Sequence, residues 1–194
     1  MSKEQERGIM AGEVFESLIR ADRGLFEAET EAAAEVREVL HRPERFNPVL
    51  ERELGHMRTP DLARVNDRGQ ITGFAEAKLG LLDERASNQL SREGSLASLR
   101  VATRFLREHH QNLAGWGLVE LSKRPQREIK VALECERVLV VPVDRDLSAP
   151  SSLIKSGART PEFEALLRNE IKIVKSPFSL EEVWAVADLV LEKG

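Results

Sequence analysis

The chain is poor in the residues that mark secreted, membrane-bound and base-stacking proteins. It has a single cysteine, Cys135, so no internal disulfide can form and a reducing compartment, the cytoplasm, is expected. No apolar run approaches the roughly 18 residues that a membrane span requires. The first ten residues lack the apolar core of a signal peptide. Seven Phe, two Trp and no Tyr leave few rings on which single-stranded bases could stack.

An excess of positive charge is also missing. The formal net charge is -4, from 33 acidic and 29 basic residues, and such a balance does not by itself indicate nucleic-acid binding. Local basic patches decide such binding more than the total charge does. With 194 residues, 41% of them apolar and 32% charged, the chain is expected to form one soluble globular domain, 1–194.

Hydrophobic periodicity and capping signals predict a mixed α/β fold with a central mixed sheet flanked by helices. Helices are expected at 8–21, 27–40, 84–109, after Thr160-Pro161, and from Ser179 to about Lys193, with only irregular or short helical structure at 41–57. Strands are expected in a hairpin within 59–78, at 115–121, 128–134 and 137–143, and in the short segment 171–174. N-terminal helices at 8–41 would precede a core at 57–143, and a C-terminal helical segment at 160–194 would pack on that core.

The hairpin brings acidic residues together. Whether the loop is Arg68-Gly69 or runs from Asp67 to Gln70, paired residue numbers add up to 137, so Asp61 faces Glu76. In an antiparallel ladder such side chains share a face, about 5 Å apart. Lys78, two residues after Glu76, points to the same face. Two adjacent carboxylates repel unless a cation lies between them, and a hard divalent ion such as Mg²⁺ suits oxygen ligands.

This pattern resembles the PD-(D/E)XK nuclease superfamily, which has the restriction-endonuclease-like fold. The signature is present as Pro60-Asp61 and, after a gap, Glu76-Ala77-Lys78, on the two strands of a hairpin. Many members also carry a Gly followed four places later by Glu on a preceding helix, and Gly12 and Glu16 have that spacing. Glu13 is a second candidate for this acidic position. The likeness covers roughly residues 8–110, and without tyrosine the RecB-like branch, which uses a Gln and Tyr motif, is not supported.

The resemblance implies a Mg²⁺-dependent endo- or exonuclease, with Mn²⁺ as a substitute and DNA, or alternatively RNA, as substrate. Asp61, Glu76, Glu16 and the backbone carbonyl of Ala77 would bind the metal, and Lys78 would complete the catalytic set with Asp61 and Glu76. A bound metal ion polarises the phosphate and lowers the pKa of the attacking water. Many enzymes of this fold dimerise to cut two strands, so a homodimer is an expectation of the resemblance.

Arginine is the expected phosphate ligand, because the chain has 21 Arg against eight Lys and guanidinium binds phosphate in a bidentate way. Arg100, Arg104 and Arg107 recur at helical spacing opposite the leucine face of the 84–109 helix. They form either a stripe that binds the nucleic-acid backbone or an ordinary solvated face.

Two observations keep other interpretations open. The tripeptide Glu-x-Lys also occurs at Glu128-Ile129-Lys130 and Glu170-Ile171-Lys172, although neither follows Pro-Asp across a short hairpin. The acidic net charge also suits a protein without nuclease activity. The alternatives are a catalytically inactive nuclease-like protein, or a helical interaction protein whose helices at 8–41 and 179–193 bind a partner.

Overall fold

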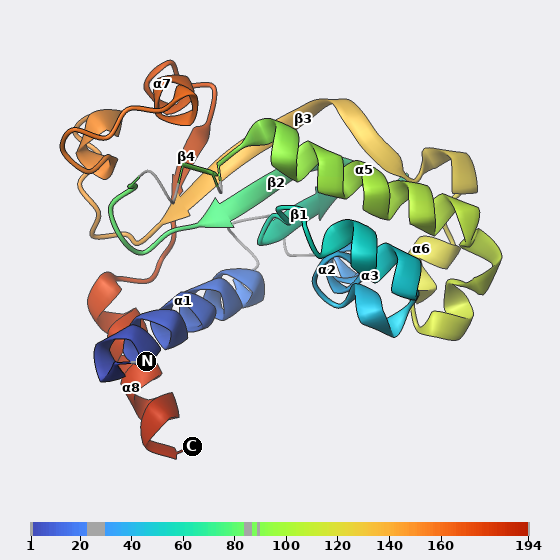
Figure 1. The fold of residues 1–194 in the computed structure, drawn as a ribbon, viewed down its shortest axis with the longest axis horizontal. Coiled ribbons are helices and arrows are strands. Elements are labelled where there is room, and N and C mark those ends of the chain that lie inside the picture. Colours follow the sequence, from blue (N-terminus) through green and yellow to red (C-terminus); the bar gives the residue numbers. More distant parts are fainter. Residues whose placement is uncertain (1, 23–29, 84–86, 89, 194) are drawn as a thin grey trace. The chain divides into compact units, whose positions relative to one another are not determined.

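The computed structural model describes residues 2–22, 30–83, 87–88 and 90–193, and it confirms the mixed α/β class. A four-stranded mixed sheet has the strand order β1-β2-β3-β4 (Figure 1). The strands are β1 (Leu62–Val65), β2 (Gln70–Ala77), β3 (Lys130–Val141) and β4 (Lys172–Lys175). The helices are α1 (Lys3–Ala21), α2 (Glu31–His41), α3 (Pro48–Leu54), α5 (Arg92–Glu108), α6 (Val119–Ser122), α7 (Pro161–Leu167) and α8 (Leu180–Lys193). Short 3₁₀ helices lie at Pro43–Arg45, His110–Asn112, Ala114–Trp116, Gln126–Glu128 and Pro150–Leu153.

Strand directions explain why the sheet is mixed. β1 and β2 are antiparallel, whereas β3 and β4 are parallel. Along β2 and β3 the residue numbers rise together. Gly69 lies beside Ile129 and Gly73 beside Glu136, while the Lys78 amide donates to the carbonyl of Val140 at 2.9 Å. β2 and β3 are therefore parallel, and α5 belongs to the crossover that such a pair requires.

The described chain divides into two compact units. Unit 1 contains Met1–Ala28, Glu76–Asn88 and Val138–Gly194, and unit 2 contains Glu29–Ala75 and Gln89–Arg137. Each unit has its own buried residues. No helix in the described part of the chain combines the length and the apolar character needed to cross a bilayer.

Unit 2 is built around the leucine face predicted for α5. Leu99, Ala102 and Leu106 are fully buried, and α5 packs against α2 and α3. α2 contributes Val36 and Val39 to the same core and also packs against β1. Apolar residues at helical spacing on α2 and α5 thus fix both helices against the hairpin.

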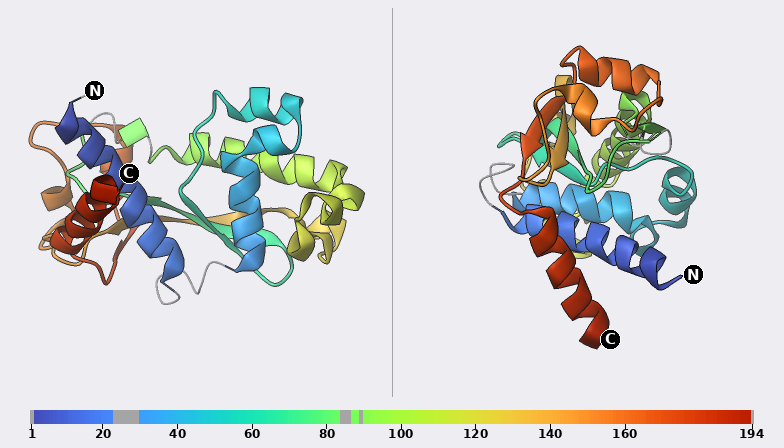
Figure 2. Two further views of the ribbon diagram at one scale, coloured as in Figure 1. Left: turned by 90° about the horizontal axis from the view of Figure 1, so that it is seen from below. Right: turned by 90° about the vertical axis from the view of Figure 1, so that its left-hand side faces the viewer.

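Unit 1 is organised by the pairing of α1 with α8, which lie side by side (Figure 2). Arg7 donates two hydrogen bonds of 2.6 Å to the carboxylate of Asp188. A capping box begins α8, as the pair Ser179 and Glu182 in the sequence indicates. The Ser179 amide donates to Glu182 Oε2 at 2.7 Å, and the Glu182 amide donates to Ser179 Oγ at 3.2 Å.

Some predictions of secondary structure are wrong. The strand expected at 115–121 is helical instead, because Gly117 adopts a left-handed φ of 84° and α6 starts at Val119. The strands expected at 128–134 and 137–143 are the single strand β3, since no turn residue separates them. α5 begins at Arg92, where Ser91 accepts a hydrogen bond from the Gly94 amide, rather than at 84; residues 84–86 and 89 lie outside the described residues.

Candidate functional site

The turn of the β1–β2 hairpin differs from both predicted loops. Asn66 faces Gln70 across the three residues 67–69, and the Asn66 amide donates to the Gln70 carbonyl at 3.0 Å. The Asn66 side chain accepts hydrogen bonds of 3.0 Å from the amides of Arg68 and Gln70. Gly69 has a φ of 88°, a left-handed conformation that glycine adopts without steric cost. This is a three-residue connection that ends in a left-handed glycine.

A bulge restores the predicted register beyond the turn. Val65 pairs with Ile71 but Arg64 pairs with Gly73, so β2 carries one extra residue, Thr72. From Arg64 to Leu62 the paired numbers then add up to 137, as predicted, and Leu62 pairs with Ala75. Asp61 precedes Leu62 in the chain, and Glu76 follows Ala75. The division between the units falls at this point, with Asp61 in unit 2 and Glu76 and Lys78 in unit 1.

In unit 1, Glu76 and Lys78 form a shielded ion pair. Lys78 Nζ lies 3.9 Å from Glu76 Oε2, and the two side chains are 18% and 7% exposed. Both therefore lie on one side of the strand, as the alternation predicts. Glutamate is rarely buried unless it is paired, because removing its charge from water costs free energy. A buried carboxylate at the end of a strand is a local exception of the kind found at functional sites.

In unit 2, the segment that leads to Asp61 is held by α2. His41 Nε2, at the end of α2, lies 2.9 Å from the carbonyl oxygen of Pro60, and Pro60 itself is buried. Asp61 is half-buried and comes directly before β1. The residue before Asp61 is thus fixed by a helix, while the residue after it is fixed by the ladder.

The acidic residues predicted on the first helix lie in unit 1. Glu16 accepts a hydrogen bond of 2.8 Å from Arg20, one turn further along α1, and its side chain is 30% exposed. Glu13 is exposed. Among the residues that the structure describes, no three His, Cys, Asp or Glu side chains gather into a group that could hold a metal ion.

The three arginines predicted to bind phosphate lie on α5 in unit 2 and differ in their partners. Arg104 donates a hydrogen bond of 2.6 Å to Glu53 on α3. Arg100 is exposed and Arg107 half-buried, and neither guanidinium is paired with another described residue. Two of the three charges are therefore open to an external anion.

The glutamates of the other two Glu-x-Lys segments are more exposed than Glu76. Glu128 accepts a hydrogen bond of 2.9 Å from Gln70, and its side chain is 26% exposed. Glu170 accepts one of 2.7 Å from Arg168 and is 51% exposed. Only Glu76 is buried among the three glutamates.

Cys135 is a packing residue rather than a nucleophile. It is buried in β3, and burial raises the pKa of its thiol to about 11. At neutral pH the thiolate, which is the reactive form, is therefore scarce.

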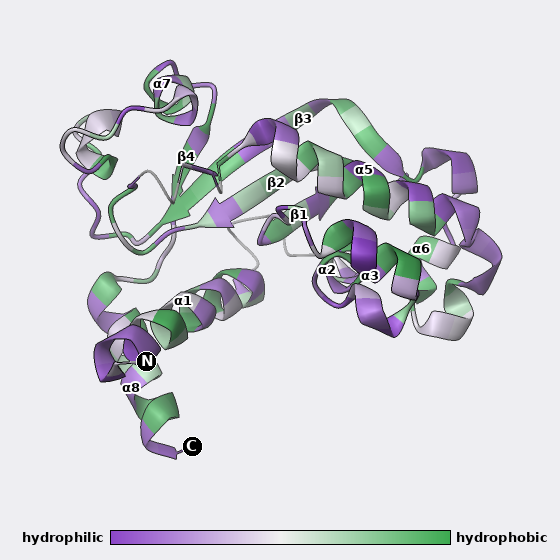
Figure 3. Cartoon of the chain, viewed as in Figure 1, coloured by the Kyte–Doolittle hydropathy of each residue, from purple (hydrophilic) through white to green (hydrophobic). Residues whose placement is uncertain are grey.

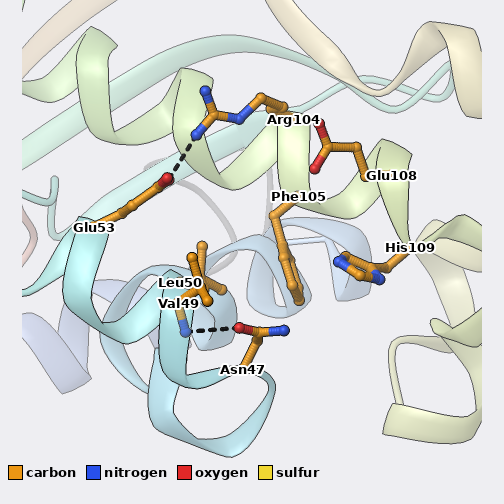
Figure 4. A pocket seen from close by; sticks show the side chains of 8 residues that line it. All are labelled: Asn47, Val49, Leu50, Glu53, Arg104, Phe105, Glu108 and His109. Atoms are coloured by element: carbon orange, nitrogen blue, oxygen red, sulfur yellow. Dashed lines mark hydrogen bonds and ion pairs between the residues drawn. The ribbon is translucent and has the colours of Figure 1, made fainter.

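Unit 2 also contains a cavity that the sequence does not reveal. It has a volume of about 460 Å³ and lies between α3 and α5 (Figure 4). Phe105 and Leu50 contribute apolar surface, and Glu53, Arg104, Glu108 and His109 contribute polar groups. The helical spacing of Arg104, Phe105 and Glu108 was a signal for one shared helix face, but the facing residues of α3 are brought there only by folding.

No family model, curated protein or solved structure matches the chain.

Proposed function

We propose that the chain is a metal-dependent nuclease of the restriction-endonuclease-like fold, acting in the cytoplasm on DNA, or alternatively on RNA. The observation that carries the proposal is the buried Glu76 carboxylate with the Lys78 ammonium 3.9 Å away. The hairpin register supports it, since the residues that follow Asp61 and precede Glu76 are paired with each other. Asp61, Glu76 and Lys78 are the proposed catalytic residues.

The donor set suits Mg²⁺. Carboxylates and a backbone carbonyl are hard oxygen ligands, and Mg²⁺ usually keeps several waters while binding one or two carboxylates and substrate phosphate. Asp61, Glu76 and the carbonyl of Ala77 would hold the ion, with Glu16, or Glu13 in its place, acting through water. When bound, Mg²⁺ or Mn²⁺ supplies Lewis-acid stabilisation of the scissile phosphate and acidifies a water molecule.

The side chains of the protein would do the remaining work. Lys78 would orient the attacking water and offset the negative charge that develops on the phosphate, because its ammonium is a compact point charge. Arg100, Arg107 and, if it leaves Glu53, Arg104 would bind backbone phosphates. The expected products are a 5′-phosphate and a 3′-hydroxyl.

A panel of end-labelled single-stranded, double-stranded and branched nucleic acids, incubated with Mg²⁺ or Mn²⁺, tests the proposal. Cleavage of at least one substrate should require the metal and should be lost in Asp61→Asn, which keeps the shape but removes the charge. Lys130→Ala, at the competing tripeptide, is the matched control and should remain active. Cleavage that survives Asp61→Asn but is lost in Lys130→Ala would show that the wrong site has been chosen.

A second candidate is a helical interaction protein, and one observation favours it. α8 has several exposed apolar side chains, and apolar residues recur along it (Figure 3). Leu189 is 55% exposed and Val190 is 44% exposed. Light scattering after gel filtration distinguishes a homodimer from a monomer, and Leu189→Glu should dissociate a dimer that uses this face.

A further inference from the structure

The cavity between α3 and α5 combines an aromatic wall with a negative rim. Phe105 lies along α5 with the ring of His109 beside it, at a centroid distance of 4.6 Å (Figure 4). Trp116 stacks nearly parallel to Phe105 at 5.5 Å, and its ring lies 5.6 Å from that of His109. A chain with few aromatic residues thus clusters three rings, of which Phe105 and His109 line the cavity.

The charges around this cavity do not cancel. Arg104 is paired with Glu53 at 2.6 Å, so these two charges compensate each other. Glu108 is exposed and has neither an ion pair nor a hydrogen bond to its side chain within the described part of the chain. The ring nitrogens of His109 likewise make no hydrogen bond there. With His109 neutral, the formal charge of the lining is therefore negative by one.

We infer that this cavity binds an organic cation whose positive charge is delocalised over a flat group, such as an amidinium or a guanidinium. Glu108 would accept its N–H groups, because carboxylates bind such forks in a bidentate way. The ring of Phe105, which lines the cavity, would attract the flat cation. Leu50 would cover its apolar part. Flat delocalised cations are weakly hydrated, so entry into a half-apolar cavity costs them less than it costs an ammonium ion.

An anionic ligand fits the same cavity poorly. Arg104 is the cation in the lining, and its hydrogen bond to Glu53 would have to break before it could bind a phosphate. Glu108 would repel that phosphate. The inference does not depend on the proposed catalytic site, because none of these residues belongs to the hairpin. Arg104 is the one residue that both proposals use.

Titration with benzamidine, followed by NMR shifts of backbone amides or by calorimetry, is the test. Benzamidine should bind and shift the amides of Leu50 and Phe105, whereas the neutral isostere benzamide should bind at least about fivefold more weakly, as expected for the loss of one charge contact near water. N-acetylarginine amide is a second probe. Binding of both cations points to an arginine side chain as the natural source, and binding of benzamidine alone points to a free aryl cation.

Two variants of exposed residues give effects of opposite sign. Glu108→Gln should weaken benzamidine binding about fivefold. Arg104→Gln should strengthen it, because Glu53 loses its partner and the lining gains a free carboxylate. Glu51→Gln, on α3 but outside the cavity lining, is the control and should change nothing. Equal binding of benzamide and benzamidine, or weaker binding in Arg104→Gln, would overturn the inference.

Discussion

Glu35 is expected to hold α6 to α2, and its removal should lower the stability of unit 2 measurably. Its two carboxylate oxygens accept hydrogen bonds from the amides of Glu120, at 2.8 Å, and Leu121, at 2.7 Å. These amides belong to the first turn of α6, where the N–H groups have no partner within the helix. One side chain from another helix therefore satisfies two such donors, with its negative charge at the positive end of α6.

The size of the effect follows from these contacts. A hydrogen bond to a charged acceptor contributes about 1.5–3 kcal/mol, and the lower end applies to a half-exposed group. We expect Glu35→Ala to lower the free energy of unfolding by about 2 kcal/mol, and Glu35→Gln, which keeps one acceptor, by about 1 kcal/mol. With a urea m-value of about 2 kcal/mol/M, the midpoint for Glu35→Ala should fall by about 1 M.

Trp116 reports on this region, because it lies close to α6 in the chain. Urea unfolding should be followed by its fluorescence in a Trp184→Phe background, which removes the only other tryptophan. Glu51→Ala, an exposed change on α3, is the control and should cost less than about 0.5 kcal/mol. A Glu35→Ala midpoint equal to that of the control would refute the capping role.

Two further predictions concern the strands. Gly69→Ala should lower the free energy of unfolding by about 1–2 kcal/mol in the same urea assay. Gly69 has a left-handed φ of 88°, and an added Cβ would lie 3.1 Å from Cβ of Arg124. An unchanged urea midpoint would contradict the turn geometry. Iodoacetamide should alkylate Cys135 at pH 7.5 at least about tenfold more slowly in the native than in the urea-unfolded protein. Burial raises the pKa of the thiol to about 11, so little thiolate is present. This scarcity outweighs the greater nucleophilicity of a more basic thiolate. The native rate should rise with pH up to that value, and equal native and unfolded rates would show that the thiol is accessible.

Much of the fold could be predicted from local patterns, and the errors have physical causes. The capping box at Ser179 and the leucine face of α5 depend on neighbours in the sequence, so both were predictable. The helix α6 was not, because Val119 and Leu121 suit a strand and the group that caps the helix, Glu35, is distant in the chain.

The candidate site, too, was predictable in the features that depend on neighbours in the sequence and not in those that depend on distant residues. Alternation along β2 predicted that Lys78 and Glu76 share a side, but their burial depends on the rest of unit 1. The register at Leu62 was right although both predicted turns were wrong, because the bulge at Thr72 offsets the three-residue loop. The ion pair between Arg104 and Glu53 joins two helices and had no sequence signal.

Calorimetric titration with Mg²⁺ and Mn²⁺ tests most directly the claim that Asp61 and Glu76 form a metal site. The native protein should bind the ion, and Asp61→Asn should lose this binding. Lys78→Ala should bind at least as well as the native protein, because it removes the positive charge 3.9 Å from Glu76, and yet it should not cleave nucleic acid. Binding heats that are the same for the native protein and Asp61→Asn, or a Lys78→Ala variant that cleaves at the native rate, would contradict the account.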